Sequence, residues 1–253
     1  MNRKRVIAYC LEAVLLVFST ATHAAGQKTE PSEPAPPPPE IKAPEHPITE
    51  NQIRTFFNVC HVVSLNRRLT HEKMELQRKQ LPEWYLQHVW DEIEDAVDNI
   101  DLPEVALPVY QKYISQDDAA WFIKFLVTPQ GQELTRLYFA EVVKAQSAGV
   151  APLDARQKAL AELANQEAGE IARILASMST KEIQDIQTHT AHLEEMKMKF
   201  LVGQMQKETA QAIIAKQMEL ANSIVARHQE EMAKAREKYE ASHVPDASSK
   251  THQ

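Results

Sequence analysis

The sequence predicts an all-α fold, in which a compact helical bundle is followed by a long helical extension or hairpin. The chain has only five glycines in 253 residues, and four of them lie after residue 48. Because the tight turns of β-hairpins need residues that adopt positive φ, such hairpins are scarce in this chain. Ala, Glu, Gln, Lys and Leu, which favour helices, are abundant. Apolar residues also recur every three or four positions, which is the period of one helix face.

Residues 1–24 have the three-part layout of a secretory signal peptide. Residues 3–5 are basic, residues 6–18 form an apolar run, and small residues lead to Ala24. The apolar run contains Glu12 and is shorter than the roughly 20 residues that a membrane-spanning helix needs. We therefore expect cleavage after Ala24, export to the periplasm, and no integral membrane segment in the mature protein.

Two further segments are expected to lack a fold of their own. Residues 25–47 include eight prolines and almost no apolar side chains. Such a segment buries too little surface to offset the entropy of folding, so it predicts an extended, disordered linker. Residues 241–253 are predicted to be a disordered tail.

The segment 48–150 contains repeated helix-start signals and predicts a bundle of five or six helices. Thr49 and Gln52 form a capping box, and a second helical stretch surrounds Met74. The third helix combines an apolar face with a run of acidic residues. Its apolar positions are Leu86, Trp90, Ile93, Val97 and Ile100, and its acidic positions are Asp91, Glu92, Glu94, Asp95 and Asp98.

That acidic run has two interpretations, a calcium site or a solvent-facing helix side. A calcium loop of the EF-hand kind alternates its ligands around a central glycine. Here the acidic residues alternate with Ile93 and Val97 at helical period, and no glycine is near. The pattern favours the solvent-facing side.

The rest of the bundle is divided by caps and prolines. A helix from Asp101 reaches Ile114, Ser115 caps the next one, and Thr128 caps another that begins at Pro129. Gly149 and Pro152 are expected to close this last helix.

The segment 153–240 predicts a long amphipathic helical extension. Ser179 and Glu182 form a capping box for a helix that continues toward Tyr239. An uninterrupted helix from 181 to 240 is about 90 Å long at 1.5 Å per residue. We therefore expect it to bend near Gly203 or to project. Its heptad seam is broken by polar residues. Three arrangements of this helix therefore stay open, namely packing on its own N-terminal domain, an antiparallel hairpin, and dimerisation.

Composition excludes some classes of function. The net charge is −7, so the chain lacks the basic surface that binds DNA or RNA. After signal cleavage Cys60 is the one cysteine left, and the apolar residues around it predict a buried thiol rather than a redox role. No catalytic motif and no cofactor-binding motif is present, so no catalytic residue and no cofactor is predicted.

His189 and His192 are the best candidates for a metal site. They are three residues apart on the long helix and therefore lie on one face, with Glu195 and Met196 about one turn further. Imidazole and thioether ligands suit copper, and imidazole also suits zinc. Because His-x-x-His specifies no third ligand, the simpler interpretation is a helix without metal. His61, His71 and His88 are scattered among the helical stripes.

Residues 110–134, YQKYISQDDAAWFIKFLVTPQGQEL, resemble the DUF2059 family of exported bacterial helical proteins. The shared features are a tyrosine-containing helix, a Ser or Thr cap before acidic residues, and a Phe followed by Thr-Pro-x-Gly. Leu126 stands where the family has an aromatic residue. The resemblance covers about 50–148 and implies an all-helical envelope domain without an activity to transfer. Phe125, Thr128, Pro129 and Gly131 are accordingly interpreted as structural, with Gly131 allowing close approach of neighbouring helices.

Together these features predict a non-enzymatic exported envelope protein with a structural or protein-interaction role. The expected partner is an envelope protein or a second copy of the chain. Two alternatives stay open, a periplasmic metal-binding protein that uses His189 and His192, and a hydrolase with an unrecognised site.

Overall fold

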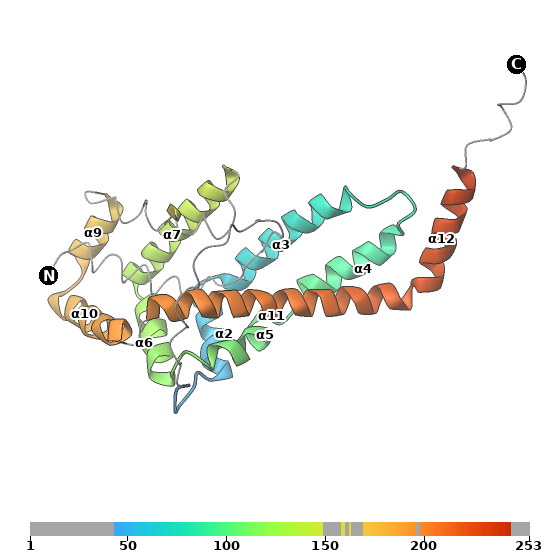
Figure 1. Ribbon diagram of the computed structural model, residues 1–253. Helices are drawn as coiled ribbons and strands as arrows, with labels where there is room; N and C mark the ends of the chain where they lie inside the picture. Colours follow the sequence, from blue (N-terminus) through green and yellow to red (C-terminus); the bar gives the residue numbers. More distant parts are fainter. Residues whose placement is uncertain (1–42, 149–157, 160–161, 163–168, 196–197, 244–253) are drawn as a thin grey trace, which may run out of the picture. The chain divides into compact units, whose positions relative to one another are not determined.

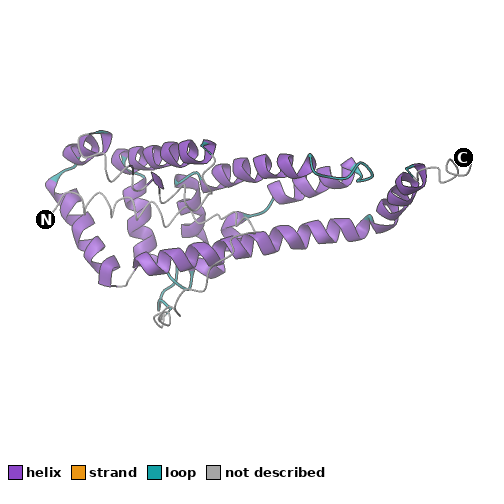
Figure 2. Cartoon of the chain, turned by 45° about the horizontal axis from the view of Figure 1, so that its top comes forward, coloured by secondary structure: helices purple, strands orange, loops and turns teal. Residues whose placement is uncertain are grey.

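The computed structural model describes residues 43–148, 158–159, 162, 169–195 and 198–243. Over these residues the protein is all-α, as the sequence predicts, and no β-strand occurs among them (Figure 2). The helices, labelled in Figure 1, are α2 (Glu50–Val59), α3 (Val62–Arg78), α4 (Gln87–Asp98), α5 (Leu102–Tyr110), α6 (Gln116–Leu126), α7 (Pro129–Ser147), α9 (Glu170–Ser177), α10 (Thr180–Glu195), α11 (Met198–Arg227) and α12 (Gln229–Ser242). The predicted signal peptide, with Ala24, and the predicted helix end at Gly149 and Pro152 lie outside the described residues.

The chain forms two compact units. Of the described residues, unit 1 comprises 43–63 and those within 102–213, and unit 2 comprises 64–101 and 214–243. Each unit therefore combines parts of the predicted bundle with parts of the predicted extension. The helix α11 contributes its first half to unit 1 and its second half to unit 2.

Unit 1 is built around an aromatic core in which α2 packs against α5 and α6, α6 against α7, and α7 against α9. The ring of Tyr110 lies edge-on to Phe56 and Phe57, with ring centroids 6.3 and 5.6 Å apart. Edge-to-face pairs of this kind stabilise a core beyond the area that they bury. The largest fully buried side chains of the unit are Tyr110, Tyr138, Phe57, Phe122, Ile48, Ile53, Leu126 and Leu134.

The predicted helix caps are present in the structure. Thr49 and Gln52 form the reciprocal capping box of α2, and Ser179 and Glu182 do the same for α10. The backbone N–H of Asp118 donates to Ser115 Oγ at 3.0 Å at the start of α6. These local hydrogen bonds satisfy backbone N–H groups that have no partner within the helix.

The last residues of the predicted linker are ordered in unit 1. Pro47 forms an isolated antiparallel bridge with Ser115, and Gln116 N donates to His46 O at 2.8 Å. Ile48 N donates to Ile114 O at 2.9 Å. The chain is therefore attached to the start of α6 immediately before α2 begins.

The helix α11 runs through Gly203 without interruption, and its end comes at Arg227 instead. A Cβ at Gly203 would meet no atom within 4 Å, so nothing in the packing requires a bend there. In unit 1, Glu208 of this helix accepts hydrogen bonds from Lys112 Nζ at 2.7 Å and Tyr113 OH at 2.6 Å. The first half of α11 is thus packed on the turn that follows α5.

Unit 2 has its own core, to which α3, α4, α11 and α12 contribute. Its buried members are Met74, Val89, Trp90, Ile93, Val97, Ile224 and Met232. The acidic side of α4 is exposed in part, as predicted, but it also forms ion pairs. Arg78 contacts Asp91 and Glu94, and Trp90 Nε1 donates to Glu94 Oε1 at 2.9 Å.

Cys60 is fully buried at the end of α2, which confirms the sequence-based prediction. Burial raises the pKa of its thiol far above the ordinary value. Because the thiolate is the reactive form, this cysteine is chemically inert at neutral pH.

Candidate functional site

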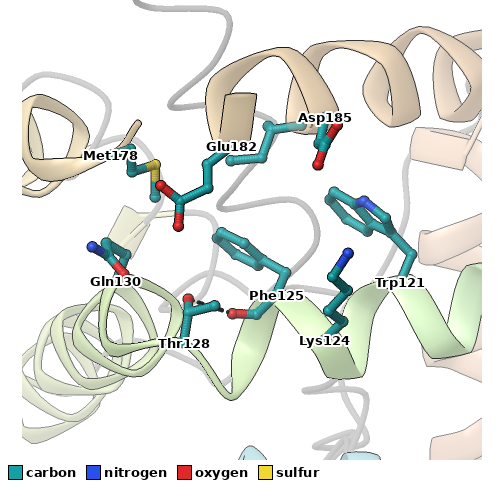
Figure 3. A pocket seen from close by; sticks show the side chains of 9 residues that line it. Trp121, Lys124, Phe125, Thr128, Gln130, Met178, Glu182 and Asp185 are labelled. Atoms are coloured by element: carbon teal, nitrogen blue, oxygen red, sulfur yellow. Dashed lines mark hydrogen bonds between the residues drawn. The ribbon is translucent and has the colours of Figure 1, made fainter. Parts of the chain in front are cut away.

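Unit 1 contains a pocket between α6 and α10, which we call the α6–α10 pocket (Figure 3). It encloses about 120 Å³. Trp121, Lys124 and Phe125 extend from α6, whereas Glu182 and Asp185 extend from α10. The remaining lining residues are Thr128, Gln130, Met178 and Ile186.

One wall of the pocket is aromatic. The rings of Trp121 and Phe125, one turn apart on α6, lie almost parallel with centroids 5.8 Å apart. The ring of His189 stacks on Trp121 with centroids 4.0 Å apart. These stacked neighbours fix the orientation of the Trp121 ring, which lines the pocket.

The opposite wall carries the negative charge of the pocket. Glu182 and Asp185 are both exposed, and Lys124 is the one basic residue among those that line the pocket. The carboxylate of Glu182 also accepts from Ser179 in the capping box, which lowers the pKa of Glu182. At neutral pH the rim therefore has two negative charges and one positive charge.

Beside the pocket, both candidate metal ligands approach one buried carboxylate. His189 Nε2 and His192 Nε2 lie 3.3 and 3.8 Å from Asp118 Oδ1. His189 Nε2 is buried, and its approach to Asp118 lacks the alignment of a regular hydrogen bond. Burial alone raises the pKa of Asp118, but the interactions with His189, Ser115 and His192 lower it more, so its net pKa lies below the ordinary value.

Ser115, Asp118 and His189 do not form a hydrolytic triad. The hydroxyl of Ser115 contacts Asp118 Oδ2 at 2.6 Å, so the carboxylate lies between the hydroxyl and the imidazole. A nucleophilic serine needs direct contact with an imidazole that takes its proton. Ser115 also caps α6, which gives this arrangement a structural explanation.

A tighter cluster of possible metal ligands occurs in unit 2. His88, His228 and Glu231 each offer one ligand atom, and these three atoms lie within 4.8 Å of one another. Among the described residues, His189 and His192 belong to no such group of three. His88 lies in the first turn of α4, His228 lies between α11 and α12, and Glu231 lies in the first turn of α12. The imidazole rings of His88 and His228 meet edge-on, with centroids 5.3 Å apart.

Glu92 and Arg227 complete this cluster. His228 Nε2 lies 2.8 Å from Glu92 Oε2, and Arg227 donates to Glu92 Oε1 at 2.5 Å. Hydrogen bonds to Glu92 and Glu231 raise the pKa of His228, and the same contact with His228 lowers the pKa of Glu92. His228 therefore lies between two carboxylates, Glu92 and Glu231.

The four residues interpreted as structural form one helix junction. Thr128 Oγ1 donates to Phe125 O at 2.7 Å and accepts from Gly131 N at 3.0 Å, which caps α7 as predicted. Pro129 is the first residue of α7. A Cβ on Gly131 would lie 2.3 Å from Phe125 O, so close approach at this position does require glycine.

In the sequence, Asp118, Glu92 and Glu231 are not part of any recognised ligand-binding motif. The spacing contains a weak signal, because His88 and Glu92 are four residues apart and His228 and Glu231 are three apart. Residues with these separations lie on one helix face. Only the fold brings the two pairs together.

No known protein family, curated protein or solved structure matches this chain. The resemblance of residues 110–134 to the DUF2059 family stays a prediction. Among the described helices, none combines the length and the apolar character needed to cross a membrane.

Proposed function

We propose that this chain is an exported, non-enzymatic protein of the cell envelope that binds a partner protein through the α6–α10 pocket. The occupant that suits the pocket is an arginine or lysine side chain in a segment of that partner. The observation that carries this proposal is the combination of an aromatic wall and two exposed carboxylates in one pocket.

The size of the pocket favours a single side chain over a small-molecule ligand. Sites for metabolites and drug-sized ligands enclose about 300–1,000 Å³. The α6–α10 pocket encloses about 120 Å³. It therefore accommodates one anchoring side chain, while the rest of the partner lies on the surface around it.

The chemistry of the pocket favours a cationic side chain. A guanidinium or ammonium group is attracted to aromatic rings within about 6 Å of their centres, and the rings of Trp121 and Phe125 line this pocket. Glu182 and Asp185 supply carboxylates opposite Trp121, and the aliphatic part of an arginine or lysine packs against Met178 and Ile186. An acidic partner side chain meets repulsion instead.

Short peptides that differ only at a central Arg, Lys, Leu or Asp test this proposal. Each is titrated into the mature chain, residues 25–253, while tryptophan fluorescence is recorded. We expect the Arg and Lys peptides to bind at least about tenfold more tightly than the Asp peptide, because their charge is complementary. Binding should weaken as salt is added.

Asp185→Lys should abolish this preference for basic peptides. Glu237→Lys makes the same charge change on the exposed face of α12 and should leave it intact. Equal affinity for the Arg and Asp peptides contradicts the proposal. The proposal is also overturned if the wild-type chain dimerises and Asp185→Lys prevents this, because the pocket would then serve self-association.

A further inference from the structure

Three potential ligand atoms converge where α4 begins and where α11 is followed by α12. Glu231 Oε2 lies 3.3 Å from His88 Nε2 and 3.4 Å from His228 Nδ1. One ligand atom from each of the three residues lies within 4.8 Å of the other two. We propose that His88, His228 and Glu231 form a binding site for Zn²⁺ within unit 2.

The separations of these atoms match the dimensions of a zinc site. Zinc binds imidazole nitrogen at about 2.0–2.1 Å and carboxylate oxygen at about 2.0–2.2 Å, with tetrahedral geometry. In a regular tetrahedron with such bonds, two ligand atoms are about 3.3–3.5 Å apart. Both distances to Glu231 Oε2 already have this value. The ligand atoms of the two imidazoles lie within 4.8 Å of each other, so side-chain rotations within the cluster can complete the tetrahedral geometry.

The donor set favours zinc over calcium, magnesium and Cu(I). Calcium and magnesium prefer oxygen ligands throughout, and Cu(I) prefers thiolates and thioethers. Two imidazoles and one carboxylate suit zinc. The side chains of His88 and Glu231 are each 54% exposed, so water can reach the fourth position of the metal.

Glu92 is the positioning residue of this site. Its Oε2 lies 2.8 Å from His228 Nε2, on the far side of the ring from Glu231. When Nε2–H donates to Glu92, Nδ1 keeps its lone pair for the metal. Arg227 holds the other oxygen of Glu92. A carboxylate that orients a ligating imidazole in this way is typical of zinc sites and raises their affinity.

The backbone around the ligands is fixed by the core of unit 2. His88 precedes the fully buried Val89, and Glu231 precedes the buried Met232; both neighbours belong to the same apolar cluster. Because the ligands come from helices far apart in the sequence, zinc would connect α4 to α12. Binding that favours the folded state raises the stability of unit 2.

Isothermal titration calorimetry of the full mature chain with ZnCl₂ tests the proposal. We expect one zinc ion per chain, and a Kd that His88→Ala and Glu231→Gln each weaken by at least about 100-fold. Glu92→Gln should weaken binding by about 10–100-fold without changing the stoichiometry. Co²⁺ in place of zinc should show the visible absorption of a tetrahedral ion, and His88→Ala should remove it.

Two control variants separate this site from other histidines. His71→Ala removes an exposed imidazole that lies 3.5 Å from Glu75, a histidine–carboxylate pair that has no third ligand among the residues that the structure describes. His192→Ala removes the exposed member of the pair beside Asp118. Both should bind zinc like the wild type. Because His88 and Glu231 are largely exposed, their variants should keep the wild-type circular dichroism. The proposal is overturned by an absence of zinc binding, by equal binding in His88→Ala, or by loss of binding in His192→Ala.

Discussion

At the scale of single residues, two glycines in helices have opposite roles. Gly131 lies in the first turn of α7, where a Cβ would approach Phe125 O to 2.3 Å and Leu126 Cα to 2.8 Å. These are backbone atoms of α6 that cannot rotate away. Gly203 lies in α11, where an added Cβ meets nothing within 4 Å. The substitution of alanine for glycine can therefore be compared at two helical positions, one crowded and one open.

We expect Gly131→Ala to destabilise unit 1 by about 1–3 kcal/mol, because α6 and α7 must separate to admit the methyl group. Gly203→Ala should instead stabilise the protein by about 0.5–1 kcal/mol, since alanine is the better helix former. Urea unfolding followed by circular dichroism measures both free energies. A Gly131→Ala variant as stable as the wild type would show that the junction of α6 and α7 is loosely packed.

At the scale of elements, Asp118 connects α6 to α10. Its side chain is 4% exposed, yet it is charged, because Ser115 donates to it and two imidazoles of α10 face it. Its position in the first turn of α6 adds the favourable interaction of a negative charge with the N-terminus of a helix. One carboxylate thus accepts from the residue that caps α6 and faces two imidazoles of α10.

Asp118→Asn should lower the free energy of unfolding by about 1.5–3 kcal/mol at neutral pH, since the hydrogen bond from Ser115 loses its charged acceptor and the two imidazoles lose their carboxylate partner. The pKa of Asp118 is lower in the folded state than in the unfolded state. Its contribution is therefore complete above the unfolded pKa of about 3.9 and is lost as pH falls through the folded pKa. The stability gap between wild type and variant should shrink below about pH 4.

Asp117→Asn provides the control, because Asp117 is the exposed neighbour in the same turn of α6. It should change the free energy of unfolding by no more than about 0.5 kcal/mol at neutral pH. Urea titrations from pH 7 down to acidic pH, followed by tryptophan fluorescence, supply the comparison. A gap for Asp118→Asn that is constant over this range would show that its charge does not stabilise the fold.

At the scale of the whole molecule, each of the two proposed sites lies within a single compact unit. The α6–α10 pocket belongs to unit 1, and the proposed zinc site belongs to unit 2. The proposed partner binding and the proposed zinc binding can therefore be tested independently. Variants in unit 1 serve as controls for zinc binding, and variants in unit 2 serve as controls for peptide binding.

Export is the prediction that concerns the whole chain. The protein recovered from a periplasmic fraction should begin at Ala25 when its intact mass is measured, because small residues precede that position. Ala24→Leu should block cleavage and leave the signal attached, whereas Ala25→Leu should be cleaved normally. An unprocessed wild-type protein in that fraction would contradict the predicted signal peptide.

Much of the fold could be predicted because its signals are local. The caps at Thr49, Ser115, Thr128 and Ser179 depend on residues within one helical turn, and the structure contains each of them. Of the two alternatives left open for the long helix, a bend at Gly203 does not occur, because a single exposed glycine weakens a helix without breaking it. The helix end at Arg227 had no comparable local signal.

The candidate sites were predicted less well, for a physical reason. His189 and His192 do share a face, as their spacing requires, but that face meets Asp118, which no helical pattern specifies. The sequence indicates no site role for His88, and it predicts that Glu92 faces solvent. The fold brings His88 to Glu231 and Glu92 to His228. Periodicity defines which side of a helix is buried, and it does not define which other helix covers it.

By itself, the sequence determined that this protein is helical, where most of its helices begin, and that Cys60 is buried. These properties follow from backbone hydrogen bonding and from the period of apolar residues within short stretches of chain. The tertiary structure alone decided that Glu208 meets Tyr113 and that Glu231 meets His88. Such contacts join residues far apart in the chain, and they form only when the packing of whole helices brings their side chains within reach.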